Sequence, residues 1–370
     1  MVPSVGACGA AQQKATKLPY EGPLVPTPGG SPEAWPTRTP DETASQDPAY
    51  SDAGSSPDER WRFGIGIAEA ADVAYWAGKL GAAWYLDWGA REVETPGGLE
   101  YWRMVRTGPR GLSPPVEKLA ALARAYPGSI WILGNEPDVI WQDNLPPEEF
   151  ARQFAQAYAV IMDADPTARI AVGAVAQVSP LRIEYLDRVL AAYRNEYMQE
   201  LPADIWTVHT YILPERAGDW GVGIPPGMDA EEGQIYEIQD HDRLDLLEAQ
   251  IRSFRSWMAE NGYQDCPLAL TELGVLMHPA YGFTEQRVQR YMRSAFDMLL
   301  SLEDEQIGPA RDGHRLVQQW AWFSLSYSLY PASDLADLER GELTPVGRAY
   351  RSYISGMPGS EDEHGESRPD

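Results

Sequence analysis

Two glutamates stand directly after short apolar runs, where carboxyl groups can carry out acid and base chemistry. Glu136 follows the run at 130–133, within Ser-Ile-Trp-Ile-Leu-Gly-Asn-Glu-Pro-Asp, and Glu272 follows the run at 268–270, within Pro-Leu-Ala-Leu-Thr-Glu-Leu-Gly. Apolar runs of this length are typical of parallel strands that are buried on both faces. Because a carboxylate is costly to bury for packing alone, both glutamates are candidate catalytic residues.

Two carboxyl groups that flank a bond are what glycoside hydrolysis requires. One acid protonates the oxygen of the leaving sugar, and the other carboxylate attacks or stabilises the anomeric carbon. A separation of about 5–5.5 Å between the two carboxyl groups predicts retention of configuration, and about 6.5–9.5 Å predicts inversion. We expect Glu136 to be the protonated acid, because apolar surroundings and the negative charge of Glu272 both raise the pKa of a carboxyl group. Glu272 would then be the ionised nucleophile.

The elements that must bring these glutamates together alternate between strand and helix patterns from residue 62 onward. Strands are expected at 63–68, 83–88, 101–106, 130–133, 170–176, 205–213, 268–273 and 317–324, and helices at 70–80, 114–125, 146–162, 182–197, 243–260, 284–302 and 347–354. Eight strands with a helix after each is the count that an α/β protein of the (β/α)8 TIM-barrel fold requires. Active sites of that fold lie at the carboxyl ends of the strands.

The fourth and seventh expected strands carry Glu136 and Glu272, so the two acids would face each other across the mouth of the barrel. Regular alternation along the seventh strand would place Leu268, Leu270 and Glu272 on its inner face. A long loop rich in glycine and proline is expected at 214–240. At its end, Asp240-His241-Asp242 precedes an expected helix, and we interpret it as a helix cap rather than a metal site.

The two ends of the chain differ in composition from the part between them. Residues 1–60 are rich in Pro, Gly, Ser, Thr and Asp and predict a disordered linker or stalk, and residues 357–370 predict a disordered acidic tail. Residues 61–356 would form a single catalytic domain. Val5-Gly-Ala-Cys8 resembles the end of a bacterial lipoprotein signal, which makes Cys8 a candidate lipid anchor, with a chance match as the alternative. We therefore expect a secreted or cell-surface protein.

The bulk composition argues against several classes of function. The formal net charge of −25 argues against a nucleic-acid partner, because phosphate contacts require clustered cations. No apolar run approaches the roughly 18 residues of a membrane span. The two cysteines cannot form a disulfide framework, and the spacing of the five histidines predicts no metal site. We expect no cofactor, a monomeric state, and a polysaccharide or oligosaccharide as the partner.

The motifs at four strand ends together resemble the signature of the clan-A glycoside hydrolases. They are Asn135-Glu136-Pro137, Thr271-Glu272, His209-Thr210-Tyr211 and Trp322, at the ends of the fourth, seventh, sixth and eighth expected strands. Within the clan, segments 84–89, 134–138 and 321–324 are most similar to the small β-1,3-glucanases related to fungal cell-wall proteins. The resemblance covers residues 62–326, nearly all of the part expected to fold.

The resemblance implies a retaining hydrolase of a β-linked polysaccharide, a β-glucan, with an activity like that of an endo-β-glucanase. In this reading Glu136 is the acid/base and Glu272 the nucleophile. Tyr211 would lie near the nucleophile, and Trp322 under the sugar at the point of cleavage. Asn135 would hydrogen-bond the sugar 2-hydroxyl, a contact that strengthens in the transition state.

Other candidate substrate residues follow from their residue types. A guanidinium within reach lowers the pKa of a carboxyl group, so Arg106 would orient or ionise the nucleophile. Trp88, Trp141 and Trp220 would stack on sugar rings at outer subsites, although large aromatic residues also pack helices onto sheets. His209 would either contact the sugar or be a hydrogen-bonded core residue.

Two other functions use the same residues. A barrel that binds glycans without cleaving them would not need both glutamates, and both are present here. A transglycosylase would use the same two acids, and product analysis with and without an acceptor sugar distinguishes it from a hydrolase.

Overall fold

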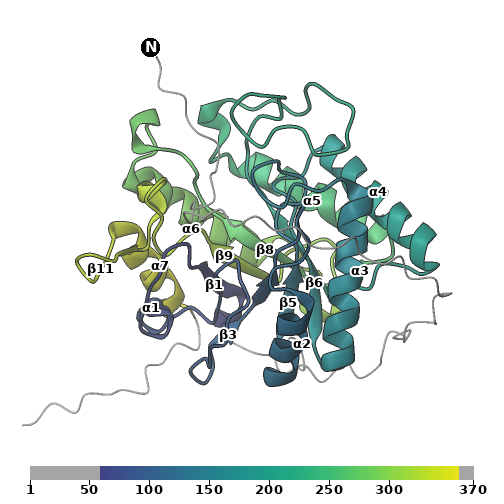
Figure 1. The fold of residues 1–370 in the computed structure, drawn as a ribbon. Coiled ribbons are helices and arrows are strands. Elements are labelled where there is room, and N and C mark those ends of the chain that lie inside the picture. Colours follow the sequence, from purple (N-terminus) through teal and green to yellow (C-terminus); the bar gives the residue numbers. More distant parts are fainter. Residues whose placement is uncertain (1–58, 358–370) are drawn as a thin grey trace, which may run out of the picture.

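A computed structural model describes residues 59–357 of the chain. Within them, nine parallel strands form one sheet that curls into a nearly closed barrel, and seven helices surround it (Figure 1). The strands are β1 (Phe63–Gly66), β2 (Trp84–Leu86), β3 (Glu100–Tyr101), β4 (Arg103–Val105), β5 (Ile130–Leu133), β6 (Arg169–Val172), β7 (Ile205–His209), β8 (Leu268–Leu273) and β9 (Gln319–Trp322). The helices are α1 (Val73–Leu80), α2 (Val116–Ala125), α3 (Pro147–Ala164), α4 (Pro180–Tyr197), α5 (Leu244–Glu260), α6 (Glu285–Ser301) and α7 (Pro345–Ser355). A small antiparallel pair, β10 (Ala336–Asp337) and β11 (Glu342–Leu343), precedes α7.

The nine strands correspond to the eight that a barrel requires, because β3 and β4 are two halves of the third one. Tyr101 in β3 pairs with β2, whereas Arg103 in β4 pairs with β5, so the chain joins both edges of the sheet around Trp102. The predicted (β/α)8 class is therefore confirmed. The expectation of a helix after every strand is wrong, since residues 87–99 between β2 and β3 form none. Pro96, Gly97 and Gly98 in that segment oppose helix formation.

Local sequence explains where several helices begin. Ser179 accepts a hydrogen bond from the backbone N–H of Arg182, and Pro180 occupies the first position of α4, where its missing N–H costs nothing. Thr284 caps α6 and Thr344 caps α7 in the same way. The residues 240–242 do not cap α5 as expected, because the residue at its cap position is Arg243.

Side chains that alternate along the strands fill two separate cores. The inner core consists of strand residues from around the barrel and of Trp102 between β3 and β4. Its members are Trp84, Leu86, Trp102, Met104, Ile130, Ile132, Ala171, Ile205, Ala269 and Ala321. The outer core packs the other face of the strands against the helices. Gly64 makes room for one of the two inner tryptophans, because a Cβ there would lie 2.3 Å from the indole of Trp84.

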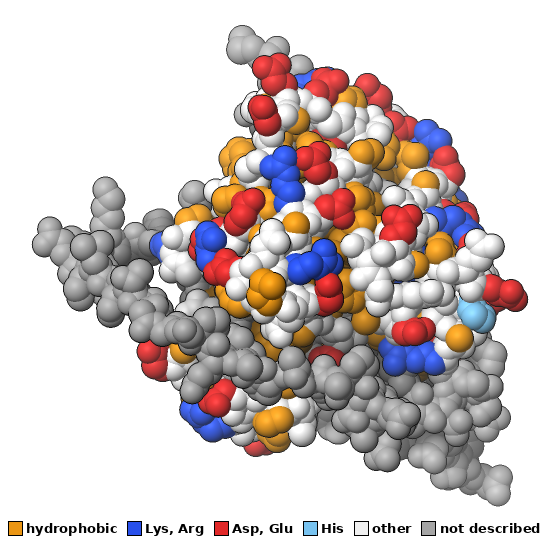
Figure 2. Space-filling model, turned by 90° about the vertical axis from the view of Figure 1, so that its right-hand side faces the viewer, with side chains coloured by type: hydrophobic (Ala, Val, Ile, Leu, Met, Phe, Trp, Pro, Cys, Tyr) orange, Lys and Arg blue, Asp and Glu red, His pale blue; other side chains and the backbone are white. Residues whose placement is uncertain are grey.

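Several expectations concern residues outside the described range. Residues 1–58 of the expected linker, which include Cys8, lie outside the described range, and so do residues 358–370 of the expected tail. Among the residues that the structure does describe, no helix is both long and apolar enough to span a bilayer. On the face drawn in Figure 2, acidic and basic side chains lie beside one another, with apolar side chains between them.

Candidate active site

Glu136 and Glu272 converge on the buried ring of His209 at the carboxyl ends of the strands. The Nδ1 of His209 lies 2.8 Å from Oε1 of Glu136, and its Nε2 lies 3.5 Å from Oε1 of Glu272. One carboxylate oxygen of each glutamate and one ring nitrogen of His209 lie within 4.8 Å of one another. Three residues from β7, β8 and the end of β5 therefore meet at one point.

An extra residue in β8 turns Glu272 into the mouth of the barrel. Leu268 and Leu270 belong to the outer core and Ala269 to the inner one, so regular alternation would point Glu272 outward. The register shifts at this place, because Val208 and His209 of β7 pair with Leu270 and Glu272. The expected shared face of Leu268, Leu270 and Glu272 is thus wrong, and the bulge reverses the phase of the strand.

The backbone after β5 has two residues with positive φ, Gly134 and Glu136, and this conformation determines the position of Glu136. Gly134 has φ 95°, and a Cβ there would lie 2.5 Å from the ring of Phe150, so this position requires glycine. Glu136 itself has φ 45°, and its N–H donates to the carbonyl of Ala174 at 2.8 Å. A non-glycine residue in the left-handed region is a strained arrangement of the kind that clusters at functional sites.

The surroundings of Glu136 favour its protonated form. Burial is the largest cause, followed by the negative charge of Asp138, and together they raise the pKa of Glu136 to about 8. The positive charges of Arg182 and Arg106 oppose this rise, and Asp143 adds to it. A carboxyl group that keeps its proton at neutral pH is suited to donate that proton in a reaction.

Glu272 is surrounded by groups that stabilise its negative charge. The Tyr211 hydroxyl donates to Oε2 at 2.8 Å, and the indole of Trp88 donates to Oε1 at 2.7 Å. Burial raises the pKa of Glu272 and the charge of Glu136 adds to this, while His209 and the two donors lower it. Burial also lowers the pKa of His209, which favours its neutral form. Its Nδ1 is hydrogen-bonded with Glu136, whereas its Nε2 has no hydrogen-bond partner in the described residues.

Asn135 presents unused polar atoms beside Glu136. Its amide donates only a long bond of 3.4 Å to Gln142, and its buried Oδ1 has no hydrogen-bond partner in residues 59–357. Its backbone N–H donates to Asp143 at 2.8 Å, which fixes the position of the residue. A buried polar atom without a partner is available to a hydroxyl of a ligand.

Arg106 does not contact the residue that it was expected to ionise. Its Nε lies 2.5 Å from Oδ1 of Asp143, and its Nη2 donates to Gln142 at 3.0 Å. These contacts place the guanidinium on the Glu136 side of the mouth, where its charge lowers the pKa of Glu136. The expected role of Arg106 at Glu272 is therefore wrong, because Asp143 holds the guanidinium elsewhere.

Trp322 lies on the opposite side of its strand from the mouth of the barrel. Its side chain is fully buried, its indole donates to the carbonyl of Ser333 at 2.9 Å, and its ring packs against Phe296 of α6. Its assignment as the platform under the sugar is wrong because it is out of phase with the inner residue Ala321. The next residue, Phe323, is in phase with that inner face.

The other tryptophans differ in how they lie. Trp88 was expected at an outer subsite, but its bond to Glu272 places it at the centre of the site. The ring of Phe323 packs edge to face against that of Trp88, with centroids 5.4 Å apart. Trp141 is 43% exposed and immediately precedes Gln142, whereas Trp220 is half-buried against the outer core. The stacking roles of Trp141 and Trp220 stay predictions.

Asp143 is a residue of the site that sequence reasoning missed. It accepts hydrogen bonds from the backbone N–H and hydroxyl of Thr107 at 2.8 and 2.7 Å, in addition to those from Arg106 and Asn135. One carboxylate thus joins the end of β4 to the end of β5. Its position in a loop carries no periodic pattern, and only the run Trp-Gln-Asp soon after Glu136 would have drawn attention to it.

The expected absence of a metal ion also stays a prediction. A cation could sit between the carboxylates and the ring nitrogen at the spacing described above.

Comparisons with known proteins gave structural neighbours only. A scan against protein-family models and a search of curated proteins returned no match. A GH128 (subgroup II) endo-β-1,3-glucanase from Sorangium cellulosum is 18% identical, with a TM-score of 0.53 over 79% of this chain and 98% of its own. A GH128 (subgroup I) endo-β-1,3-glucanase from Amycolatopsis mediterranei, solved with laminaritriose, is 21% identical, with a TM-score of 0.51 over 79% and 99%.

A third neighbour is a GH128 (subgroup III) curdlan-specific exo-β-1,3-glucanase from Blastomyces gilchristii, solved with glucose. It is 19% identical, with a TM-score of 0.55 over 80% of this chain and all of its own. At these identities the likeness shows a shared fold.

Proposed function

We propose that this protein is a retaining glycoside hydrolase that cleaves a β-linked glucan, with Glu136 as the acid/base and Glu272 as the nucleophile. The observation that carries the proposal is the meeting of the two carboxyl groups over His209, with an oxygen of each within 4.8 Å. This spacing supports retention, which requires about 5–5.5 Å between the carboxyl groups. Inversion needs a wider gap, because a water molecule must fit between acid and sugar.

The opposite environments of the two carboxyl groups support their division of roles. Glu136 holds its proton through burial and the charge of Asp138, so it delivers the proton to the glycosidic oxygen as that bond breaks. Glu272 receives two hydrogen bonds, from Tyr211 and Trp88, which favour its ionised form. It attacks the anomeric carbon, and Glu136 then removes a proton from water to release the sugar.

A neutral His209 suits both roles at once. With its proton on Nε2, the ring points a positive edge at the ionised Glu272 and presents the lone pair of Nδ1 to the protonated Glu136. The same ring thereby favours a proton on Glu136 and a charge on Glu272. Asn135, with its unpartnered Oδ1, is the group that we assign to the sugar 2-hydroxyl.

The substrate assignment rests on the neighbours and on the sequence resemblance. The neighbours described above are β-1,3-glucanases, and one was solved with a laminari-oligosaccharide. We therefore propose a β-1,3-linked glucan as the substrate of this chain. The neighbours include endo- and exo-acting proteins, so the size of the first products must be measured for this one. A polymeric substrate also agrees with a secreted or surface-attached monomer.

The deciding experiment compares the wild type with Glu136→Gln and Glu272→Gln on laminarin, curdlan and unrelated soluble polysaccharides. We expect both variants to stay folded and to lose activity by several orders of magnitude on a β-1,3-glucan. Azide should rescue the two variants with products of opposite anomeric configuration, which separates the acid from the nucleophile. Hydrolysis that persists in either folded variant would refute the assignment.

A further inference from the structure

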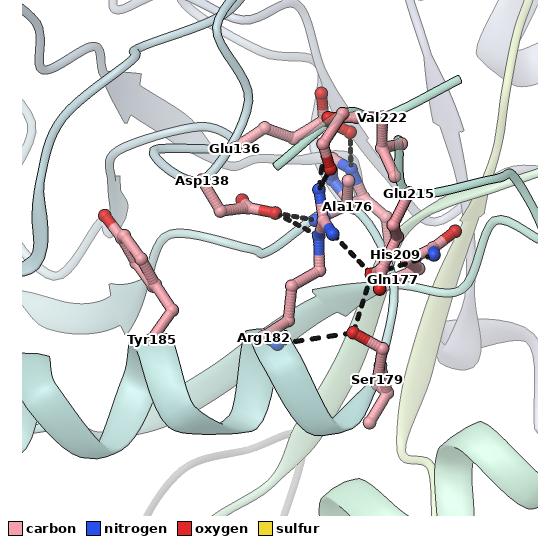
Figure 3. Close-up of polar contacts among 12 residues, drawn as sticks. Glu136, Asp138, Ala176, Gln177, Ser179, Arg182, Tyr185, His209, Glu215 and Val222 are labelled. Atoms are coloured by element: carbon pink, nitrogen blue, oxygen red, sulfur yellow. Dashed lines mark hydrogen bonds and ion pairs between the residues drawn. The ribbon is translucent and has the colours of Figure 1, made fainter. Parts of the chain in front are cut away.

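A buried cluster of three charged side chains lies beside Glu136 and takes no direct part in the proposed mechanism. Arg182, in the first turn of α4, contacts Asp138, two residues after Glu136, and also Glu215 in the long loop after β7 (Figure 3). Its Nε donates to Oδ2 of Asp138 at 2.6 Å, and its Nη1 donates to Oε1 of Glu215. All three side chains are fully buried. We refer to these three residues as the Arg182 cluster.

The Arg182 cluster is held by many polar contacts. The hydroxyl of Ser179 donates to Oε1 of Glu215 at 2.6 Å, and Gln177 donates to the same oxygen at 3.1 Å. The backbone N–H of Gln234 donates to Oε2 of Glu215 at 2.7 Å. Buried charges are costly to desolvate, and apolar side chains of similar volume often stabilise a fold as well or better. Stability alone is therefore a weak reason for three charges at this place.

One side of the Arg182 cluster fixes the segment that carries Glu136. The backbone N–H of Ala176 donates to Oδ2 of Asp138 at 3.2 Å, and the N–H of Glu136 donates to the carbonyl of Ala174 at 2.8 Å. Both ends of the short segment 136–138 are thus tied to the chain that follows β6. A displacement of Asp138 would move Glu136, because Pro137 between them has little freedom.

The charges of the Arg182 cluster also act on Glu136. Asp138 raises the pKa of Glu136 and Arg182 lowers it. Among the other nearby charges, Asp143 raises this pKa and Arg106 lowers it. Across the mouth, Glu136 faces His209 from β7 and Glu272 from β8.

The other side of the Arg182 cluster fixes the loop at 214–234. The backbone N–H of Glu215 donates to the carbonyl of Gln234 at 2.9 Å, which closes the base of the loop. The Nη2 of Arg182 donates to the carbonyls of Val222 and Gly223 at 3.2 and 3.3 Å, in the middle of the loop. Since this loop follows the carboxyl end of β7, it lies on the face where barrel enzymes bind substrate.

We propose that Arg182, Asp138 and Glu215 are positioning residues that hold the loop 214–234 and the acid/base glutamate in one fixed arrangement for the polysaccharide. A single guanidinium contacts both the segment that places the acid and the loop on the substrate face. The proposal rests on the proposed function, because it takes Glu136 as the acid. The three residues would keep the proton donor Glu136 aligned with the glycosidic oxygen of a polysaccharide that the loop holds.

The first test is the pH profile of kcat/KM for Asp138→Asn on a soluble β-1,3-glucan. This change removes a negative charge that favours the protonated form of Glu136. The alkaline limb of the profile should move to lower pH by about one unit. A structural role alone would lower stability and activity without moving this limb.

The second test distinguishes the role of the Arg182 cluster in holding the loop from its effect on the pKa of Glu136. Glu215→Gln removes the charged contact of the loop with Arg182 but leaves Arg182 paired with Asp138, so the loop is held less firmly and we expect KM for the polysaccharide to rise roughly tenfold. The alkaline limb should move less than in Asp138→Asn. Glu200→Gln, which disrupts the exposed pair with Arg194, serves as the control and should change neither quantity.

The outcomes separate this proposal from the proposed function. If Glu136→Gln remains active, the function itself fails. If Glu136→Gln is inactive while folded Asp138→Asn and Glu215→Gln keep the wild-type limb and KM, only the positioning role fails. Should both variants fail to fold, Ser179→Ala decides, because it removes the 2.6 Å bond to Glu215 and keeps all three charges. A raised KM in folded Ser179→Ala supports the role, and an unchanged KM overturns it.

Discussion

The indole of Trp88 donates a hydrogen bond of 2.7 Å from its Nε1 to Oε1 of Glu272. The ring reaches this place because Gly66 of β1 has no side chain, and a Cβ there would lie 2.8 Å from Cη2 of Trp88. With Tyr211 donating to Oε2, both oxygens of the carboxylate receive a donor that stabilises the negative charge. The proposed nucleophile therefore depends on a residue that follows β2, three strands away from β8 in the sheet.

Trp88→Phe should weaken the nucleophile while preserving the aromatic packing. Without the indole donor the pKa of Glu272 rises, so the acid limb of the pH profile of kcat/KM should move to higher pH. We expect the maximal rate to fall by roughly tenfold to a hundredfold. Tyr211→Phe removes the donor on the other oxygen and should move the limb in the same direction. An acid limb that stays in place in both variants would contradict the assigned role of Glu272.

The wild-type pH profile should be bell-shaped and wide on its alkaline side. Activity requires Glu136 protonated, and burial and the charge of Asp138 raise its pKa to about 8, so activity should persist through neutral pH and fall near pH 8. The acid limb should lie above the ordinary pKa of a glutamate, because burial raises the pKa of Glu272. The two limbs belong to the coupled pair. Steady-state kinetics across pH 4–10 measure both, and an alkaline limb near pH 5 would contradict the environment described for Glu136.

The barrel could be predicted from periodicity, but the direction of single side chains could not. Alternation of apolar residues identified all eight barrel strands, because buried strands and amphipathic helices differ in period. The same alternation wrongly placed Leu268 and Leu270 on the inner face of β8. An extra residue in this strand changes which side chains point inward, and nothing in the composition indicates it. The same limit explains Trp322, where the resemblance pointed to a residue one position from the inner face.

The residues of the candidate site that belong to motifs at strand ends could be predicted from the sequence. Glu136, Glu272, His209 and Tyr211 meet as expected, because parallel strands deliver their carboxyl ends to one edge. Asp143 and Glu215 lie in loops, and their partners are distant in sequence or belong to the backbone. No local pattern predicts such pairings, so the position of Arg106 could not be derived from the sequence either.

Phe323 should matter for catalysis and Trp322 for stability. Phe323 lies next to Trp88 at the inner face, so Phe323→Ala should lower kcat/KM by roughly tenfold through loss of an aromatic surface for the sugar. Trp322→Phe removes the donor to the buried carbonyl of Ser333 and should lower the free energy of unfolding by about 1–3 kcal/mol. Its kinetics should match the wild type. Kinetics on laminarin and urea denaturation test both variants. A loss of kcat/KM in Trp322→Phe with unchanged kinetics in Phe323→Ala would support Trp322 as the sugar platform.

Chelation should leave the activity unchanged. The proposed reaction uses two carboxyl groups for proton transfer and nucleophilic attack, and neither step requires a cation. Activity measured after dialysis against EDTA should therefore equal that of an undialysed sample. Loss of activity that returns on addition of one divalent cation would show that the groups around His209 serve a different chemistry.

His241 should make the fold less stable as the pH falls below neutral. Its Nδ1–H donates to the carbonyl of Ile212 at 3.0 Å, and its Nε2 accepts the N–H of Leu276 at 2.8 Å, so the buried ring joins the chain after β7 to the chain after β8. A proton on Nε2 would oppose that second bond. Burial lowers the pKa of His241 to about 4. Between pH 6.5 and pH 4 the unfolded chain therefore binds more protons than the folded one, and stability decreases as the pH falls.

The measurement compares the free energy of unfolding at pH 7 and pH 4.5 for the wild type and His241→Gln. The shift of His241 predicts that the wild type loses about 2–3 kcal/mol more over this interval than a variant without the imidazole. Glu136 and Glu272 have raised pKa values and contribute a change of the opposite sign, but they are the same in both proteins and cancel in the difference. His278→Gln, at an exposed histidine, is the matched control and should behave as the wild type. Equal losses in the wild type and His241→Gln would contradict the lowered pKa of His241, because a ring with an ordinary pKa contributes no such difference.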